Sequence, residues 1–171
     1  MKTFPARYAL IGKSGAGKSE VAKILQSHCS CNIIKTGQIC RDISQMLFGN
    51  DDKRSTQTLD DALTPIDESI FLRASMRGID TSQPFVIDSL RFISDLTIAR
   101  SLNCFLLRVV ADDHIRLARL ANRGQQFDLS KDGSHRSEVE LDAAEVTETI
   151  NNNGAFSDLE ASALRAISLH Q

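Results

Sequence analysis

The sequence predicts an α/β fold of three layers, α/β/α, in which a five-stranded parallel sheet has helices on both faces. Two observations predict it. Short apolar runs alternate with longer segments of helical periodicity along all 171 residues. The run at residues 85–88, after Pro84, is continuously apolar before its final aspartate, which is typical of a parallel strand buried on both faces. Without repeats or a linker, residues 1–171 are expected to form one domain.

The first elements are the clearest. Residues 8–11 form a short apolar run that ends in glycines, as expected of a strand followed by a tight turn. Residues 18–29 then have apolar side chains at helical spacing. A second strand is expected at residues 32–35, and a second helix at residues 37–48, where Ile39, Ile43 and Leu47 are spaced by four.

The middle of the chain is less regular. Residues 50–58 are polar and charged, so we expect a loop there. A helix is expected to start at Thr64-Pro65, because threonine is a good N-cap and proline suits the first helical position. This helix should end near Met76, before Gly78. The third strand is the apolar run at residues 85–88.

The C-terminal half continues the alternation of helices and strands. Ser157 and Glu160 have capping-box spacing, which predicts the start of a terminal helix. The other expected elements are a helix at 92–101, a strand at 104–110, a helix at 112–123, a polar stretch at 124–134, a short helix from Ser137 and a last strand at 147–150.

Composition excludes several classes of protein. The net charge of −2 lacks the basic excess that is typical of nucleic-acid-binding proteins, so a nucleic-acid partner is not expected. Four cysteines without zinc-finger spacing indicate reduced thiols in a cytoplasmic protein. No apolar run is long enough to span a membrane, and the first residues lack the apolar middle of a signal peptide.

The strongest functional signal follows the first strand. It is the phosphate-binding motif G-x-x-x-x-G-K-[ST], formed by Gly12, Lys13, Ser14, Gly15, Ala16, Gly17, Lys18 and Ser19. Its glycines let successive N–H groups point at phosphate oxygens, and the following helix adds its positive N-terminal end. Lys18 is expected to bind the β- and γ-phosphates, and Ser19 is expected to bind Mg²⁺. The expected cofactors are therefore ATP and Mg²⁺.

Other motifs distinguish among nucleotide-binding proteins. The sequence lacks Asn-Lys-x-Asp, the guanine-reading motif, and lacks Asp-x-x-Gly after a strand, where a GTPase senses its γ-phosphate. It is also short for an oligomeric motor module. These absences favour a small kinase, a class that holds both a phosphate donor and an acceptor.

A specific resemblance supports the kinase. Thr36, Gly37 and Arg41 match the Thr-Gly-x-x-x-Arg segment of adenylate kinases and their relatives, although Lys35 and Gln38 depart from its commonest form. The resemblance implies that Thr36, Gly37 and Arg41 hold the acceptor nucleoside monophosphate. A guanidinium suits this role because it can bind two phosphate oxygens at once. The acceptor-binding helical part is then expected at about 37–80.

A second segment follows the third strand. Asp88-Ser89-Leu90-Arg91 is similar to the family's Asp-Gly-x-(Pro)-Arg, with Ser89 in place of glycine. A carboxylate at the end of such a strand orders the waters around Mg²⁺, so Asp88 is expected to act on the metal through water. The resemblance makes Arg91 a second clamp on the acceptor phosphate.

Three arginines share one face of the helix expected at 112–123: Arg116, Arg119 and Arg123. Such a stripe repels itself unless an anion lies there. Arg119 and Arg123 also match the Arg-x-x-x-Arg at which adenylate-kinase-like proteins begin their lid. The resemblance implies a short lid at about 119–137, with Lys18, Asp88, Arg119 and Arg123 as catalytic residues.

The C-terminal residues 147–154 and the helix after them resemble dephospho-coenzyme-A kinases and phage deoxynucleoside monophosphate kinases. The sequence therefore predicts an ATP-dependent transfer of the γ-phosphoryl group to a nucleoside or deoxynucleoside monophosphate, by a monomer or homodimer. Three alternatives stay open: a dephospho-coenzyme-A kinase, although the family's Asp-Pro-Leu-Leu-like segment is missing; a kinase of modified bases in DNA; and an ATP-binding switch without catalysis.

Overall fold

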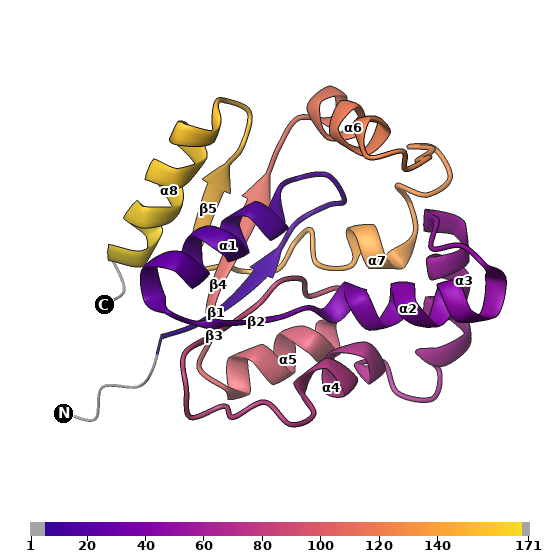
Figure 1. The fold of residues 1–171 in the computed structure, drawn as a ribbon, viewed down its shortest axis with the longest axis horizontal. Helices are drawn as coiled ribbons and strands as arrows, with labels where there is room; N and C mark the ends of the chain where they lie inside the picture. The colour runs from indigo at the N-terminus through magenta and orange to yellow at the C-terminus, as the bar shows by residue number, and fades with distance from the viewer. Residues whose placement is uncertain (1–5, 169–171) are drawn as a thin grey trace.

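The computed structural model describes residues 6–168, and the fold in this part of the chain is the predicted one (Figure 1). A five-stranded sheet has the order β2-β3-β1-β4-β5, and each neighbouring pair is parallel. The strands are β1 (Arg7–Ile11), β2 (Asn32–Ile34), β3 (Phe85–Ile87), β4 (Phe105–Val110) and β5 (Glu148–Asn151).

Helices cover both faces of the sheet (Figure 1). Helices α1 and α8 pack on one face, and α4 and α5 pack on the other. Helices α2 and α3 extend beyond the edge of the sheet, next to α4. The helices are α1 (Lys18–Cys29), α2 (Thr36–Phe48), α3 (Lys53–Leu63), α4 (Ile70–Met76), α5 (Ile93–Ser101), α6 (Asp113–Asn122), α7 (Arg136–Val139) and α8 (Phe156–Ser168).

Strand β1 lies at the centre of the sheet and shows why both faces are covered. Successive side chains of a strand point to opposite faces. Tyr8 and Leu10 belong to the apolar cluster under α1 and α8, whereas Ala9 and Ile11 belong to the cluster under α4 and α5. All four side chains are buried. The turn after β1, which carries the phosphate-binding motif, is therefore held by two cores at once.

The prediction for residues 50–64 was wrong in part. Of the loop expected at 50–58, residues 50–52 do precede the helix, but residues 53–58 are the N-terminal part of α3. Thr64 caps the C-terminus of α3 instead of starting the next helix. Asp52 is the N-cap, and its Oδ1 accepts a hydrogen bond from the Ser55 N–H at 2.8 Å. Leu59 packs with Cys40 and Phe71 in a third apolar cluster. Residues 53–58 contain no apolar side chain, so the first half of this helix resembles a polar loop in the sequence.

Two helix ends also differ from the predictions. Helix α6 ends at Asn122, one residue before the expected end, and Arg119 lies within it as expected. Helix α8 begins at Phe156, one residue before the expected cap. Asp158 still satisfies a backbone donor there, since its Oδ2 accepts from the Ala155 N–H at 3.0 Å.

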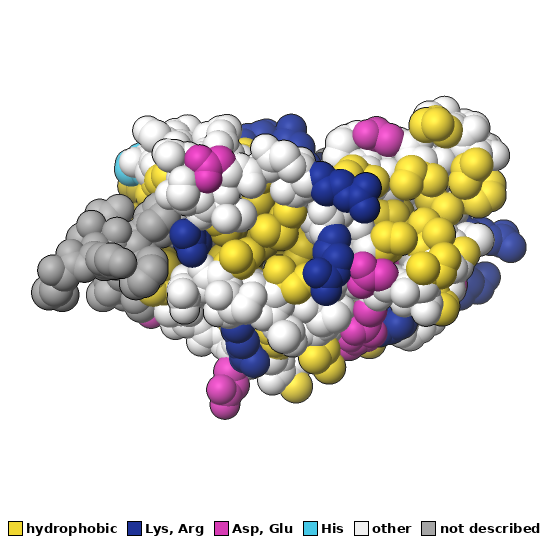
Figure 2. All heavy atoms as spheres, turned by 90° about the horizontal axis from the view of Figure 1, so that it is seen from below, with side chains coloured by type: hydrophobic (Ala, Val, Ile, Leu, Met, Phe, Trp, Pro, Cys, Tyr) yellow, Lys and Arg dark blue, Asp and Glu magenta, His cyan; other side chains and the backbone are white. Residues whose placement is uncertain are grey.

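The surface at the α2–α3 end of the molecule is partly apolar (Figure 2). Met46, Leu47 and Phe48 at the end of α2 are exposed, as is Ile66 before α4. None of the helices within residues 6–168 combines the length and apolarity that crossing a membrane requires.

Candidate active site

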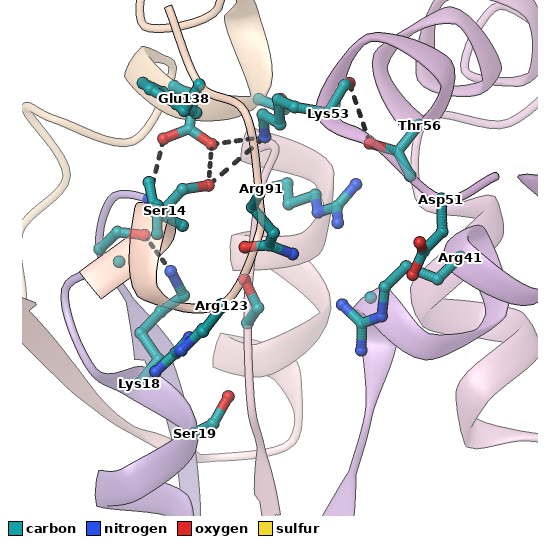
Figure 3. A pocket seen from close by; sticks show the side chains of 18 of the residues that line it. Ser14, Lys18, Ser19, Arg41, Asp51, Lys53, Thr56, Arg91, Arg123 and Glu138 are labelled. Atoms are coloured by element: carbon teal, nitrogen blue, oxygen red, sulfur yellow. Dashed lines mark hydrogen bonds and ion pairs between the residues drawn. The ribbon is translucent and has the colours of Figure 1, made fainter. Parts of the chain in front are cut away.

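A cavity of about 190 Å³ opens where the turn after β1, the helices α2 and α3, and residues 123–138 meet (Figure 3). It lies at the C-terminal ends of the parallel strands, where α/β folds bind their ligands. The lining residues are Gly12, Ser14, Gly15, Lys18, Ser19, Gly37, Arg41, Asp51, Lys53, Thr56, Asp88, Ser89, Arg91, Leu120, Arg123, Gln125, Gln126, Phe127, Ser137 and Glu138.

The phosphate loop, residues 12–19, forms the floor of this cavity. Its glycines are structurally necessary. Gly17 has a φ of 104°, and a Cβ there would lie 2.1 Å from the Asn152 Nδ2. Gly12 has a φ of 150°, and a Cβ there would lie 2.3 Å from the Val109 carbonyl oxygen. Any other residue would therefore strain the loop and move it away from its supports.

Lys18 is the first residue of α1, at the cavity wall. Its Nζ donates to the carbonyl oxygens of Gly12 and Lys13, so the ammonium lies against the loop (Figure 3). Burial lowers the pKa of Lys18 to about 8, although the nearby carboxylates of Glu138 and Asp88 oppose this shift. A phosphate at the loop would stabilise the charged form of Lys18.

The loop is supported from outside the cavity. Arg116 is buried, and its Nη1 donates to the Ser14 carbonyl oxygen at 2.6 Å. Asn152 is also buried, and its Nδ2 donates to the Ala16 carbonyl oxygen at 2.8 Å. Arg119 in turn donates to the Asn152 carbonyl oxygen at 2.9 Å. The Arg119 guanidinium thus binds the loop's support and does not line the cavity, so its catalytic role stays a prediction.

The opposite wall carries two arginines that meet at Gly37. A Cβ on Gly37 would lie 3.1 Å from the Arg41 Nη1 and 3.3 Å from the Arg91 Nη2, so the glycine makes room for both guanidinium groups. Arg91 forms an ion pair with the buried Asp60, in which its Nη1 donates to both carboxylate oxygens at 3.0 Å. Arg41 donates to the Gln38 Oε1 at 2.9 Å and has no ion-pair partner within residues 6–168.

Asp88 lies between the two walls, directly after β3. Its Oδ1 accepts a hydrogen bond from the Thr36 N–H at 3.0 Å. Burial raises the pKa of Asp88, and this hydrogen bond and the charge of Lys18 act against that shift. Proteins bind Mg²⁺ with one or two oxygen ligands, while phosphates and waters complete the octahedron. The Ser19 hydroxyl and the Asp88 carboxylate both line the cavity and are suitable oxygen donors.

Among the lining residues that sequence reasoning missed are Lys53 and Glu138, whose charged groups contact each other. The Glu138 Oε2 accepts from the Ser14 N–H at 2.9 Å, and its Oε1 accepts from the Ser14 hydroxyl at 2.6 Å and from the Lys53 Nζ at 2.7 Å. Burial raises the pKa of Glu138, but Lys53 and the Ser14 donors outweigh burial and bring it down to about 2. Lys53 falls in the segment that was expected to be a loop. For Glu138, the only sequence signal was the short helix expected from Ser137.

The remaining sequence predictions divide between cavity and surroundings. Gly12, Ser14, Gly15, Lys18, Ser19, Gly37, Arg41, Asp88, Arg91 and Arg123 line the cavity together. The predicted residues that do not line it are Lys13, Ala16, Gly17, Thr36 and Arg119. Of these, Lys13 points to Asp142, at 3.4 Å, and Thr36 is buried behind Asp88.

Comparisons with known proteins agree with this fold. A family model described as an AAA domain matches residues 9–142. No curated protein matches the sequence. A gluconokinase from Sinorhizobium meliloti 1021 aligns over 98% of this chain and 94% of its own, with a TM-score of 0.69 and 19% identity.

Shikimate kinases are similar in structure as well. The enzyme from Aquifex aeolicus vf5 aligns over 95% of this chain and 96% of its own, with a TM-score of 0.61 and 12% identity. The enzyme from Acinetobacter baumannii, solved in complex with shikimate, aligns over 98% of this chain and 93% of its own, with a TM-score of 0.56 and 12% identity. Together these similarities establish the fold of the P-loop kinases for this chain.

Proposed function

The chain belongs to the AAA-domain family, and we propose that it is an ATP-dependent phosphotransferase. Its proposed acceptor is a nucleoside or deoxynucleoside monophosphate. The proposed cofactors are ATP and Mg²⁺, and the segment 123–135 is the proposed lid.

One observation carries the choice of acceptor. Arg41 faces the phosphate loop across the cavity, and its guanidinium has no ion-pair partner among the described residues. A guanidinium fork binds a phosphate dianion through two parallel hydrogen bonds. An ATP-binding switch without catalysis has no use for such a cation on the acceptor side. The geometry thus favours an acceptor that carries its own phosphate.

The reaction needs little covalent chemistry from the protein. A phosphate oxygen of the acceptor is already a nucleophile, so positioning and charge stabilisation dominate catalysis. Lys18 and Arg123 would stabilise the charge of the transferred group from the donor side, and Arg41 would orient the acceptor. Closure of the segment 123–135 would exclude water, which otherwise competes as acceptor. Mg²⁺, held through Ser19 and Asp88, would supply further charge neutralisation.

A second acceptor class is supported by a different observation. Arg91 is neutralised by Asp60, and the cavity also presents the carboxylate of Asp51 beside Arg41 (Figure 3). Arg41 and this nearby carboxylate could also hold a small hydroxy acid, whose carboxylate would bind Arg41 and whose hydroxyls would donate to Asp51. The similarity in fold to a gluconokinase and to shikimate kinases is a reason to test hydroxy acids as acceptors. Dephospho-coenzyme A remains a third acceptor to test.

The test is ADP release from Mg-ATP with a panel of acceptors: ribo- and deoxynucleoside monophosphates, gluconate, shikimate and dephospho-coenzyme A. We expect a strong increase with one nucleoside monophosphate. An increase with a hydroxy acid alone would replace the proposed acceptor. ATP turnover that is independent of every acceptor would favour the ATP-binding switch.

The Lys18→Ala variant is the catalytic control. We expect its turnover to fall by at least about a thousandfold, since it removes a charge from the transferred group. Normal turnover in this variant would contradict the proposed site.

A further inference from the structure

Three separate parts of the chain meet at the carboxylate of Glu138. Ser14 belongs to the phosphate loop, Lys53 is the first residue of α3, and Glu138 lies in α7. The Lys53 Nζ also lies 3.4 Å from the Ser14 Oγ, so the three polar groups form one closed cluster (Figure 3). We call Ser14, Lys53 and Glu138 the Glu138 junction.

The Glu138 junction is buried but remains at the cavity wall. The side chain of Glu138 is 5% exposed and that of Lys53 is 16% exposed, yet both residues line the cavity. A buried ion pair is held by good geometry and by full hydrogen bonding. Here the carboxylate accepts three hydrogen bonds at 2.6–2.9 Å, one of them from the Lys53 ammonium. The carboxylate is therefore well bound where it lies.

The donors around Glu138 are of the kind that bind a phosphoryl group. They comprise a backbone N–H of the phosphate loop, a hydroxyl and an ammonium. Backbone N–H groups of such a loop point at phosphate oxygens when a nucleotide is bound. The Ser14 N–H cannot serve the Glu138 carboxylate and a phosphate oxygen fully at the same time, and the two anions would repel each other.

The position of the Glu138 junction indicates which phosphate of ATP would bind there. Ser14 belongs to the donor side of the cavity and Lys53 to the acceptor side. A phosphoryl group that is transferred from donor to acceptor must pass through a point within hydrogen-bond distance of both sides. The α- and β-phosphates remain with the donor, so the site between the two sides suits the γ-phosphoryl group.

Other contacts within the protein hold α7 in this place. The Gln57 Nε2 donates to the Asp132 carbonyl oxygen at 3.1 Å. The His135 Nε2 lies 3.0 Å from the Asp61 Oδ1, and Arg136 pairs with Glu68. All three contacts join residues 132–136 to α3 or to the segment between α3 and α4. Tertiary contacts thus position the Glu138 carboxylate against the phosphate loop.

We propose that, in the nucleotide-free protein, Glu138 occupies the subsite of the transferred phosphoryl group, and that Lys53 is a further catalytic residue. When ATP binds, its γ-phosphate replaces the carboxylate, and Lys53 exchanges Glu138 for the phosphoryl group. This inference rests on the proposed function, since it assigns a role within the same site. It adds a cation from α3 to Lys18 and Arg123.

The test compares the affinities of Mg-ADP and of the Mg complex of the β,γ-imido analogue of ATP, by calorimetry. Only the analogue carries the third phosphate. In Glu138→Gln the competing charge is removed, and we expect the analogue to bind about tenfold more tightly relative to ADP. In Lys53→Gln we expect the analogue to bind about tenfold more weakly relative to ADP, and kcat to fall with it.

Matched controls lie next to each position. Glu140→Gln removes a carboxylate that pairs with Arg136 and does not line the cavity. Arg54→Gln removes a cation beside Lys53 that does not line it either. Neither control should change the ratio of the two affinities. Thermal unfolding of all four variants confirms that each is folded before its ratio is read.

The outcomes separate the two proposals. If wild type binds both nucleotides and Glu138→Gln leaves the ratio unchanged, or weakens the analogue, the inference is overturned and the proposed function stands. The same holds if Lys53→Gln leaves the ratio and kcat unchanged. If neither nucleotide binds to wild type, the proposed function itself is contradicted, and with it the inference.

Discussion

Arg41 and Arg91 show how much the surroundings of a residue decide its role. Both guanidinium groups approach Gly37, and both were expected to clamp an acceptor phosphate. The charge of Arg91 is compensated by Asp60, whose side chain is 2% exposed. That pair cannot be broken without leaving a buried charge alone, so Arg91 also holds α3 to the sheet. Among the residues that the structure describes, Arg41 has a single and neutral partner, Gln38, so it is the freer of the two to bind a ligand.

We therefore expect Arg41→Ala to raise the acceptor KM by about 10- to 100-fold, because a charge-assisted pair is lost. The affinity for ATP should change little. Steady-state kinetics with the acceptor varied at saturating Mg-ATP measure the first effect, and calorimetry measures the second. The matched control is Arg77→Ala, an exposed arginine after α4 that does not line the cavity. Equal effects of the two substitutions would contradict a specific role for Arg41.

At the scale of elements, α3 has the greatest influence on the site. Its first residue is Lys53, its inner face carries Thr56 and Asp60, and Gln57 contacts residue 132. The helix packs through Leu59 on a small cluster of its own and not on the sheet. With so little apolar contact, the stability of α3 depends on its cap and on polar contacts.

The N-cap of α3 gives a test at this scale. Asp52→Ala removes the acceptor for the Ser55 N–H and should cost about 1 kcal/mol of unfolding free energy. In a chain of this length that corresponds to a Tm lower by about 2–4 °C. Asp52→Asn should retain most of the stability, since asparagine caps as well as aspartate. If thermal unfolding shows both variants to be equally destabilised, the cap is not the cause.

At the scale of the whole molecule, two interfaces meet at the cavity. Residues 132–136 are bound to α3 through Gln57 and Asp61 and to the α3–α4 connection through Glu68, and Glu138 is bound to the phosphate loop. These contacts connect the donor side, the acceptor side and the proposed lid. Stability and nucleotide binding should therefore be coupled through the Glu138 junction.

The pH dependence of the unfolding free energy tests the ion pair between Glu138 and Lys53 in this junction. The pKa of Glu138 is lowered from 4.5 to about 2, so in the folded protein the carboxylate binds its proton less readily than in the unfolded chain. Its stabilising contribution is present in full above about pH 4.5 and is lost as the pH falls towards 2. Urea unfolding of wild type and Glu138→Gln should thus differ most at pH 5–7, and the difference should shrink at pH 4 and 3. A difference that is independent of pH would contradict the ion pair.

The sequence by itself determined the strands, most helices and the phosphate loop. These features depend on local signals: apolar runs, helical periodicity and a motif whose eight residues are contiguous. The positions of Arg41, Asp88 and Arg91 at the ends of strands or the start of a helix were predictable for the same reason. Parallel strands bring such ends to one edge of the sheet, whatever the rest of the chain does.

Only the tertiary structure decided which charges are free. Arg119 was predicted from its spacing, but it binds Asn152, 33 residues away. Glu138 and Ser14 are 124 residues apart, and Glu138 and Lys53 are 85 apart. No local pattern encodes such partners, because ion pairs and buried hydrogen bonds depend on which groups the fold brings within about 3 Å. The phosphate loop can be found in the sequence, but the carboxylate that lies on it cannot.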